Sequence, residues 1–554
     1  MRVHPMNRTW HRFAALAVCL TAVACFLAAL RTDFSPAVGA AHVARATDDA
    51  QPAADAPVAA PGSLAEAIAA VTDEERFRSA HWGLLIVDVA SGEVLLEQNA
   101  DKLFAPASTT KLFTVAAALA ALGADHRYET ALYQIGLPPA DGRLEGHLVL
   151  LASGDPTLGG RTDEHGEIAY TNADHTYADG SERTELTAPD PLAGLNELAR
   201  QVAAAGIRRI EGDVLVDDRL FDATESTGSG PRRVTPIVVN DNLLDIVVAP
   251  TEVGQPARIE WRPETSYYQL EADVTTGAAD REAQVSLREI APRRLRLEGS
   301  IPAGHEPLVH VHEVDDPAAF ARALLIEALE RADVRVAADP RSAAAAELPA
   351  PSAYGDLPRV GLLESPPFSE SARLILKVSH NLHASTLPLV LAARGGGRTL
   401  AAGLRMQGEV LGTLDVDVPT ISLGGGAGGS RADYTTPRAT VALLRHMATR
   451  DDAAVFRRAL PILGVDGTLS TAVAADSPAR GHAQAKTGTF YWQNPLAGRY
   501  LLTSKALAGY LQTSNGRDVA FAFFVNLVPI DRPSERNELG RVLGHLCEIA
   551  HERL

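Results

Sequence analysis

The stretch Pro106-Ala107-Ser108-Thr109-Thr110-Lys111-Leu112-Phe113 places a serine and a lysine three residues apart. It opens a run rich in alanine and leucine that stops at Gly123, which predicts a helix over residues 107–122. Residues three apart on a helix share a face, so we expect the Lys111 amine to approach the Ser108 hydroxyl. A neutral lysine is a suitable base for a serine nucleophile, and the helix N-terminus adds positive potential where negative charge develops. Taken alone, the spacing also fits a solvated helix start with an incidental lysine.

Lysine is rare in this chain, because arginine supplies almost all of the positive charge. The five lysines are Lys102, Lys111, Lys377, Lys486 and Lys505. Arginine is effectively never deprotonated, whereas a lysine that is desolvated or placed beside another cation loses its proton readily. The few lysines that are retained therefore indicate positions that need a compact or neutralisable amine.

A second motif, Ser379-His380-Asn381, follows directly after Lys377. A hydroxyl and a carboxamide two residues apart offer a group that passes a proton and an amide that holds a substrate carbonyl. As an isolated tripeptide it also fits a loop in which Ser and Asn bond their own backbone.

A third motif, Lys486-Thr487-Gly488 followed by Thr489, lies in what we expect to be an edge strand. The cation and the hydroxyl suit a terminal carboxylate, and Gly488 lets a substrate backbone come close. We expect the backbone N–H groups of Ser108 and Thr489 to form an oxyanion hole. Taken alone, the motif also fits a lysine at the surface end of a strand.

The order of the three motifs, SxxK then SxN then KTG, is the set shared by serine β-lactamases and penicillin-binding proteins. The separation of Ser108 from Ser379 is far too long for the compact helical insert of a class A β-lactamase. The deacylation motif Glu-x-x-Leu-Asn is also missing from the sequence.

With these motifs and the long insertion, the chain resembles the S13 peptidase family, the low-molecular-mass class C penicillin-binding proteins similar to penicillin-binding protein 4. The resemblance runs from about Leu84 to the C-terminus. Further matching stretches are Ser153-Gly154-Asp155-Pro156-Thr157-Leu158, residues 212–221 with Asp217-Asp218, Leu463-Gly464-Val465-Asp466-Gly467-Thr468-Leu469, and Val525-Asn526. The resemblance implies an α/β (α+β) serine β-lactamase or transpeptidase-like fold that is split by a large strand-rich insertion.

The resemblance also implies a function and a set of site residues. It implies serine-type D-Ala-D-Ala carboxypeptidase activity on peptidoglycan stem peptides, DD-endopeptidase activity on cross-links, and acylation by β-lactam antibiotics, which act as inhibitors. The implied catalytic residues are Ser108, Lys111, Ser379 and Asn381; the implied substrate-binding residues are Lys486, Thr487, Gly488 and Thr489. Two alternatives stay open: a β-lactamase or esterase on the same fold, and a non-catalytic peptidoglycan-binding protein.

Three positions depart from the family pattern. The stretch Gly425-Gly426-Ala427-Gly428-Gly429-Ser430-Arg431 stands where the family usually has Asp-Gly-Ser-Gly-Leu-Ser-Arg, so an acid and a hydroxyl are lost near the cleft. Ala384 is followed by Ser385 where Glu is usual, and His380 replaces the commoner Asp or Asn. These departures bear on ligand preference and rate.

The composition and the N-terminal sequence argue against one class of partner and indicate where the protein is located. The chain of 554 residues has a net charge of −18, and this acidic excess argues against a nucleic-acid partner. A basic start followed by an apolar run through residue 30 predicts an export signal over residues 1–40, either cleaved or kept as a membrane anchor. We therefore expect an exported, periplasmic or extracytoplasmic protein. Cleavage would leave Cys547 as the single cysteine. The sequence has no ligand spacing such as HExxH, so we predict neither a metal site nor a cofactor.

The predicted organisation has four parts. After the signal, residues 41–63 form an Ala/Pro-rich linker; residues 64–136 and 356–554 form the catalytic domain, and residues 137–355 are inserted accessory domains. The sequence predicts strands at residues 83–89, 93–98, 507–511 and 519–526, and further helices at residues 320–331, 373–393 and 534–554.

Overall fold

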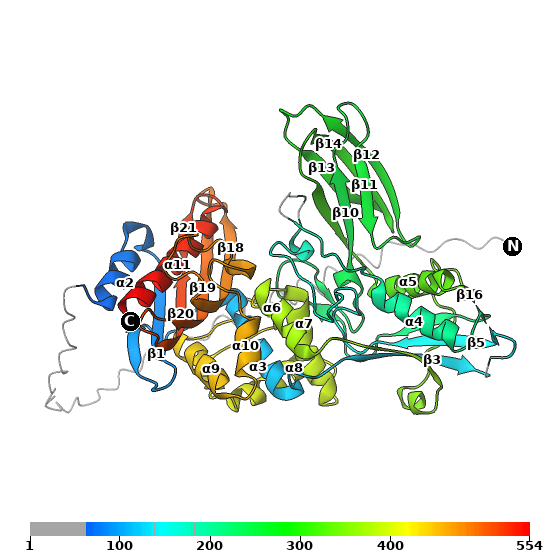
Figure 1. The fold of residues 1–554 in the computed structure, drawn as a ribbon, viewed down its shortest axis with the longest axis horizontal. Helices are drawn as coiled ribbons and strands as arrows, with labels where there is room; N and C mark the ends of the chain where they lie inside the picture. The colour runs from blue at the N-terminus through cyan, green and yellow to red at the C-terminus, as the bar shows by residue number, and fades with distance from the viewer. Residues whose placement is uncertain (1–61, 138, 179, 181–183) are drawn as a thin grey trace, which may run out of the picture. The chain divides into compact units, whose positions relative to one another are not determined.

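The computed structural model describes residues 62–137, 139–178, 180 and 184–554 (Figure 1). Ala59–Leu554 form one compact unit. The predicted signal or anchor and almost all of the predicted linker lie outside the described residues. None of the described helices is long and apolar enough to cross a membrane.

The largest sheet joins the two ends of the described chain. Its strands run antiparallel in the order β18-β19-β20-β1-β2, and β21 pairs with β19. Leu84 of β1 lies opposite Phe523 of β20, and both are fully buried. The strands are β1 (His81–Asp88), β2 (Val94–Gln98), β18 (Ala483–Asn494), β19 (Arg499–Gln512), β20 (Asp518–Asn526) and β21 (Val528–Ile530).

Helices cover both faces of this sheet. On one face α2 (Leu64–Thr72) and α11 (Glu535–Arg553) pack against Leu84 and Phe523. On the other face Leu85 and Phe524 join a second core with the remaining helices. These helices are α3 (Thr110–Leu122), α6 (Phe368–Lys377), α7 (Asn381–Arg394), α8 (Leu400–Gly412), α9 (Pro437–Thr449) and α10 (Ala453–Ala459). A sheet between two helical layers confirms the predicted α/β class.

The insertion, residues 137–355, contributes two of the four strands of a second sheet, together with two helices that pack on it. The order is β17-β3-β5-β7, and α4 (Ala193–Ala204) and α5 (Pro317–Arg331) share its core. The strands are β3 (Glu129–Gly136), β5 (Gly146–Leu151), β7 (Val214–Asp217) and β17 (Arg359–Glu364). A small sheet of β4 (Arg143–Leu144), β6 (Arg209–Ile210) and β16 (Arg335–Val336) lies beside it. β3 and β17 flank the insertion and pair with each other, and β3 also pairs with β5 of the insertion, so one sheet crosses both predicted boundaries. The domain boundaries stay a prediction.

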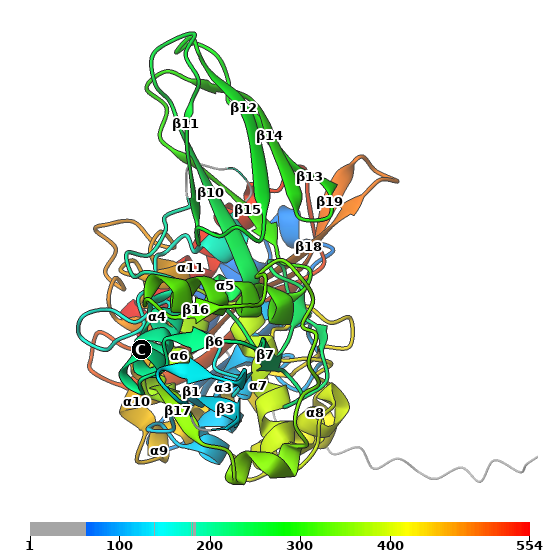
Figure 2. The same cartoon turned by 90° about the vertical axis from the view of Figure 1, so that its right-hand side faces the viewer.

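Two further three-stranded sheets lie together within the insertion (Figure 2). One has the order β11-β10-β15 and the other β12-β14-β13, and Ile246 and Leu297 belong to one buried core. The strands are β10 (Leu243–Ala249), β11 (Arg258–Arg262), β12 (Gln269–Gly277), β13 (Gln284–Ala291), β14 (Arg294–Pro302) and β15 (Leu308–Glu313). A two-stranded ribbon of β8 (Thr224–Glu225) and β9 (Arg233–Val234) completes the strands.

The prediction of one helix over residues 373–393 is wrong, because the chain breaks there into α6 and α7. Ser379 adopts φ +66°, a left-handed conformation that a right-handed helix cannot contain. His380 then caps α7, since its side chain accepts the N–H of His383. The break places the SxN motif at the junction of two helices.

A buried charged cluster joins the insertion to this junction. Asp241 lies in the left-handed turn Asn240–Asn242, a conformation that Asn and Asp tolerate better than most residues. Its Oδ2 accepts hydrogen bonds from Arg161 at 2.7 Å and from His175 Nε2 at 2.8 Å. Arg161 also holds Asp174 with two hydrogen bonds, and His175 Nδ1 lies 2.6 Å from Asp245. We call Arg161, Asp174, His175, Asp241, Asp245, His380 and His383 the Asp241 cluster.

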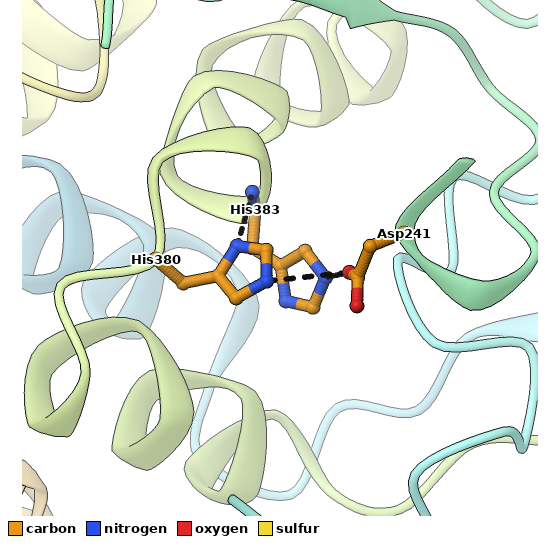
Figure 3. Close-up of side chains that lie close together, drawn as sticks. All are labelled: Asp241, His380 and His383. Atoms are coloured by element: carbon orange, nitrogen blue, oxygen red, sulfur yellow. Dashed lines mark hydrogen bonds and ion pairs between the residues drawn. The ribbon is translucent and has the colours of Figure 1, made fainter. Parts of the chain in front are cut away.

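The second oxygen of Asp241 faces the two histidines of the junction (Figure 3). His383 Nε2 lies 2.6 Å from Asp241 Oδ1, and His380 Nε2 lies 3.3 Å from the same atom. Burial and the neighbouring His380 lower the pKa of His383 to about 4, so His383 is neutral and donates its Nε2–H. Asp245 and Asp241 raise the pKa of His175 to about 10, although burial acts to lower it. One carboxylate therefore holds groups from the insertion and from α7.

Asp241→Asn removes the charge that the cluster shares. We expect it to lower the free energy of unfolding by about 3–5 kcal/mol, because breaking a buried ion pair leaves an uncompensated charge. Urea unfolding followed by tryptophan fluorescence measures this loss. The control is Asp222→Asn, which breaks a half-exposed pair with Arg398 and costs at most about 1 kcal/mol. Equal losses in the two variants would contradict a structural role for the cluster.

Candidate active site

The first motif forms the centre of the site. Ser108 lies in the short 3-10 turn Ala107–Thr109, and Lys111 lies in the first turn of α3. Lys111 Nζ is 3.0 Å from Ser108 Oγ, as the three-residue spacing predicts. Ser108 is partly exposed, whereas Lys111 is fully buried. The hydroxyl therefore faces the solvent side and its amine partner faces the interior.

Lys111 has two further contacts, each from a distant part of the chain. Nζ lies 2.7 Å from Asn381 Oδ1 and 2.6 Å from the carbonyl oxygen of Ala427. Burial lowers the pKa of Lys111 well below its usual value, and the nearby Lys486 lowers it further. The arrangement favours a neutral amine at this position.

The second motif meets the first through Asn381. This residue begins α7, and its Nδ2 donates to the backbone oxygen of Ser229 at 2.9 Å. The backbone oxygen of Ser379 accepts a hydrogen bond from the Tyr177 hydroxyl at 2.5 Å. Ser229 and Tyr177 both belong to the insertion, so the insertion holds the SxN motif from two sides.

The third motif lies on β18, next to the other two. Lys486 Nζ donates to Ser379 Oγ at 2.9 Å and is fully buried. Burial, with the neighbouring Lys505, lowers the pKa of Lys486 to about 7. A side chain at Gly488 would place its Cβ 2.4 Å from the Pro106 carbonyl oxygen, so glycine permits β18 to lie against the Ser108 turn.

The three motifs open into one cavity of about 760 Å³. Ser108, Asn381 and Thr489 line it together with residues of the insertion such as Tyr177 and Ser229. The structure thus brings Ser108, Asn381 and Thr489 to one surface, with Lys111, Ser379 and Lys486 behind it. Thr487 does not line this cavity, and its hydroxyl donates to Thr468 Oγ1 at 2.9 Å.

The glycine-rich stretch that departs from the family pattern forms one wall of the site. Gly428 has φ +93°, and a Cβ there would lie 1.9 Å from the Ala107 carbonyl oxygen. The backbone of this stretch therefore packs directly on the Ser108 turn. Asp433 supports the stretch by accepting the N–H groups of Gly424 and Ser430, and burial raises the pKa of Asp433 to about 6.

Sequence reasoning missed the Ala427 carbonyl, Ser229, Tyr177 and Asp433. Ala427 does lie in the stretch that departs from the family pattern, but no residue type marks its backbone carbonyl. No motif or periodicity marks the other three, which lie in loops or a short 3-10 turn and contact the site only through the fold. The lysine count did single out Lys377, whose Nζ pairs with Asp466 at 2.6 Å. This pair fixes the end of α6 to the Leu463–Leu469 stretch and places Lys377 beside the site, outside its cavity.

One set of metal-type ligands gathers among the described residues: Asp241, His380 and His383. The 2.6 Å between His383 Nε2 and Asp241 Oδ1 is a hydrogen-bond distance, whereas two ligands of a tetrahedral zinc ion lie about 3.3 Å apart. Arg161 also neutralises the same carboxylate. These atoms fit a hydrogen-bonded ion cluster better than a metal site. The expectation of no metal and no cofactor stays a prediction.

The geometry can be compared with known proteins. A model of the D-Ala-D-Ala carboxypeptidase 3 (S13) family matches residues 64–545. The D-alanyl-D-alanine carboxypeptidase of an Actinomadura species is 29% identical over 467 residues, which cover 80% of each chain. The D-alanyl-D-alanine carboxypeptidase DacB of Haemophilus influenzae is 23% identical over 461 residues, which cover 80% of this chain and 85% of the relative.

Solved structures agree on the fold. Penicillin-binding protein 4 from Haemophilus influenzae matches with a TM-score of 0.63 at 20% identity, covering 86% of this chain and 98% of that chain. The same protein in complex with a β-lactam gives a TM-score of 0.61. The predicted penicillin-binding-protein fold is therefore confirmed. Since the family match spans most of the sequence, the chain belongs to the D-Ala-D-Ala carboxypeptidase 3 (S13) family of serine peptidases.

Proposed function

We propose that this peptidase cleaves the D-Ala-D-Ala ends of peptidoglycan stem peptides, and the corresponding cross-links, through an acyl-enzyme on Ser108. The observation that carries the proposal is the set of contacts around Lys111 Nζ. A neutral amine has two N–H groups and one lone pair. Asn381 Oδ1 and the Ala427 carbonyl accept the two N–H groups, so the lone pair is left for the Ser108 hydroxyl.

This arrangement supports the first chemical step. Lys111 takes the proton of Ser108 as the oxygen attacks the carbonyl carbon of the penultimate D-Ala. The negative charge that develops on the carbonyl oxygen is stabilised by the backbone N–H groups of Ser108 and Thr489. Asn381, held by Lys111 and Ser229, positions the substrate amide.

The leaving group and the water complete the cycle. Lys111 gives the proton that it took from Ser108 to Ser379, and Ser379, bonded to Lys486, passes a proton to the departing amine as the peptide bond breaks, leaving an ester on Ser108. Lys486 and Thr487 bind the carboxylate of the leaving D-Ala, and Gly488 lets the substrate backbone approach β18. Lys111, now neutral again, takes a proton from the attacking water and returns it to Ser108 Oγ as the ester breaks, which restores the free serine.

β-Lactams are proposed to react at the same serine. A strained lactam carbonyl placed over Ser108 forms the same ester, and the related penicillin-binding protein 4 of Haemophilus influenzae has been solved with a β-lactam. Slow hydrolysis of that ester would make β-lactams inhibitors, whereas fast hydrolysis would make the protein a β-lactamase.

The proposed substrate also sets the location. Peptidoglycan lies outside the cytoplasm, and residues 1–40 have the composition of an export signal. We therefore place the enzyme in the cell envelope, by export with either a cleaved signal or a retained anchor.

Ser108→Ala tests the nucleophile. We expect kcat/KM for D-alanine release from a stem pentapeptide to fall by roughly 10³-fold or more, because no other group forms the acyl-enzyme. The control is Ser342→Ala, an exposed serine of the insertion, which should leave the rate within about twofold. Full activity in Ser108→Ala would rule out the mechanism. No release by the wild type would instead favour the non-catalytic peptidoglycan-binding alternative.

The pH dependence tests the two buried lysines. Lys111 acts as a base only when neutral, so acylation by penicillin should fall as the pH drops through its lowered pKa. Lys486 binds a carboxylate only when protonated. The rate should therefore also fall as the pH rises above about 7, the pKa of Lys486 in the enzyme without substrate. Stopped-flow acylation rates from roughly pH 5 to 10 record both limbs.

The variant Lys486→Gln tests which lysine causes each limb of the pH profile. Because the charge of Lys486 helps to depress the pKa of Lys111, its removal should shift the acidic limb to higher pH and abolish the alkaline limb. The matched control is Lys102→Gln, which removes an exposed lysine outside the cavity and should keep the wild-type profile. An acidic limb that stays in place in Lys486→Gln would contradict the assignment.

A further inference from the structure

A second cavity, of about 500 Å³, borders the KTG motif on the side of α11. Thr487 and Thr468 line it, and Lys505, Asn537 and Arg541 are among its other lining residues. The Ser108 cavity instead meets the next part of β18, at Thr489 and Phe490. The strand that carries the KTG motif therefore borders both cavities.

The second cavity is positively charged. None of the described residues that line it is acidic. Arg541 is a cation, and Lys505 becomes one when it is protonated. Lys505 is a lysine that the three motifs leave unexplained. It is largely buried, and its Nζ donates to Thr489 Oγ1 at 2.9 Å. Burial and the neighbouring Arg536 lower the pKa of Lys505 to about 8. Such a lining suits an anionic ligand.

Thr487 relates this cavity to the leaving group. In the proposed reaction Thr487 binds the carboxylate beside the departing amine, and its hydroxyl is bonded to Thr468. Both threonines line the second cavity, so this cavity adjoins the place where the proposed reaction puts the leaving carboxylate. A single D-Ala ends at its methyl group and carboxylate, whereas cavities of about 300–1,000 Å³ hold much larger ligands.

We propose that this cavity is the subsite for the leaving half of a peptidoglycan cross-link, an anionic peptide whose carboxylates pair with Lys505 and Arg541. The proposal rests on the proposed function and adds to it the place where the leaving peptide of a cross-link binds. The bond that breaks joins the donor D-Ala carbonyl to the side-chain amine of the acceptor peptide. The ester forms on Ser108, the proton passes through Ser379 to that amine, and water later releases the donor peptide as its carboxylic acid.

Arg541→Glu is the direct test, since Arg541 is exposed on α11 and takes no part in the acylation step. The wild type and the variant are given two substrates, a stem pentapeptide and a cross-linked muropeptide dimer. We expect the ratio of kcat/KM for the dimer to that for the pentapeptide to fall at least about fivefold, because a charge reversal repels an anionic peptide. The matched control is Arg405→Glu, an exposed arginine of α8 that lines neither cavity and should keep the wild-type ratio.

Ionic strength gives a second readout that does not depend on a variant. Salt screens exposed charges, so raising it should lower the wild-type ratio and leave that of Arg541→Glu less affected. An unchanged ratio in Arg541→Glu, or a wild type that cleaves the pentapeptide but not the dimer, would overturn the subsite. Failure of the wild type on both substrates, with no acylation by penicillin, would overturn the proposed function itself.

Discussion

The site is organised around a buried amine. Lys111 is fully buried, yet its Nζ has three polar partners within 3.0 Å, supplied by the 3-10 turn that precedes α3, by the start of α7 and by the glycine-rich stretch at Ala427. A charged amine at this depth would cost several kcal/mol, so burial favours the neutral form. The same requirement gathers distant segments, because a buried amine needs partners for its N–H groups. Folding and activation of the serine thus depend on one set of contacts.

The insertion takes part in this arrangement. Ser229 holds Asn381, and Tyr177 holds the backbone of Ser379. Behind them, the Asp241 cluster joins the insertion to His380 and His383 at the start of α7. A side chain that contacts no reacting atom can still set the position of Asn381, because His380 precedes it directly in the chain. The insertion therefore belongs to the structure of the site and also forms one wall of its cavity.

Much of the site could be predicted from the sequence, because its chemistry is concentrated in short motifs. A serine and a lysine three apart on a helix share a face, so their contact could be predicted without the rest of the fold. The scarcity of lysine also marked Lys111 and Lys486, both of which are buried with lowered pKa values. The strands β1 and β20 were predicted to within a few residues, since each is a continuous apolar run.

The remainder depends on contacts that have no local pattern. The helix break at Ser379 escaped prediction because the apolar residues on either side keep a helical spacing, and only the left-handed backbone of one serine separates the two helices. The Ala427 carbonyl is a backbone atom, so no residue type marks it. In the sequence, Asp241 has the pattern of a turn residue between Asn240 and Asn242. Its role in the cluster depends on partners that lie far away in the sequence.

The most direct test of the account is the position of the acyl group. The enzyme is treated with penicillin, digested, and mapped by mass spectrometry, with the stoichiometry taken from the intact mass. We expect one adduct per chain, on the peptide that contains Ser108. An adduct on any other residue, or an unmodified protein, would contradict the claim that Lys111 activates Ser108 as the nucleophile.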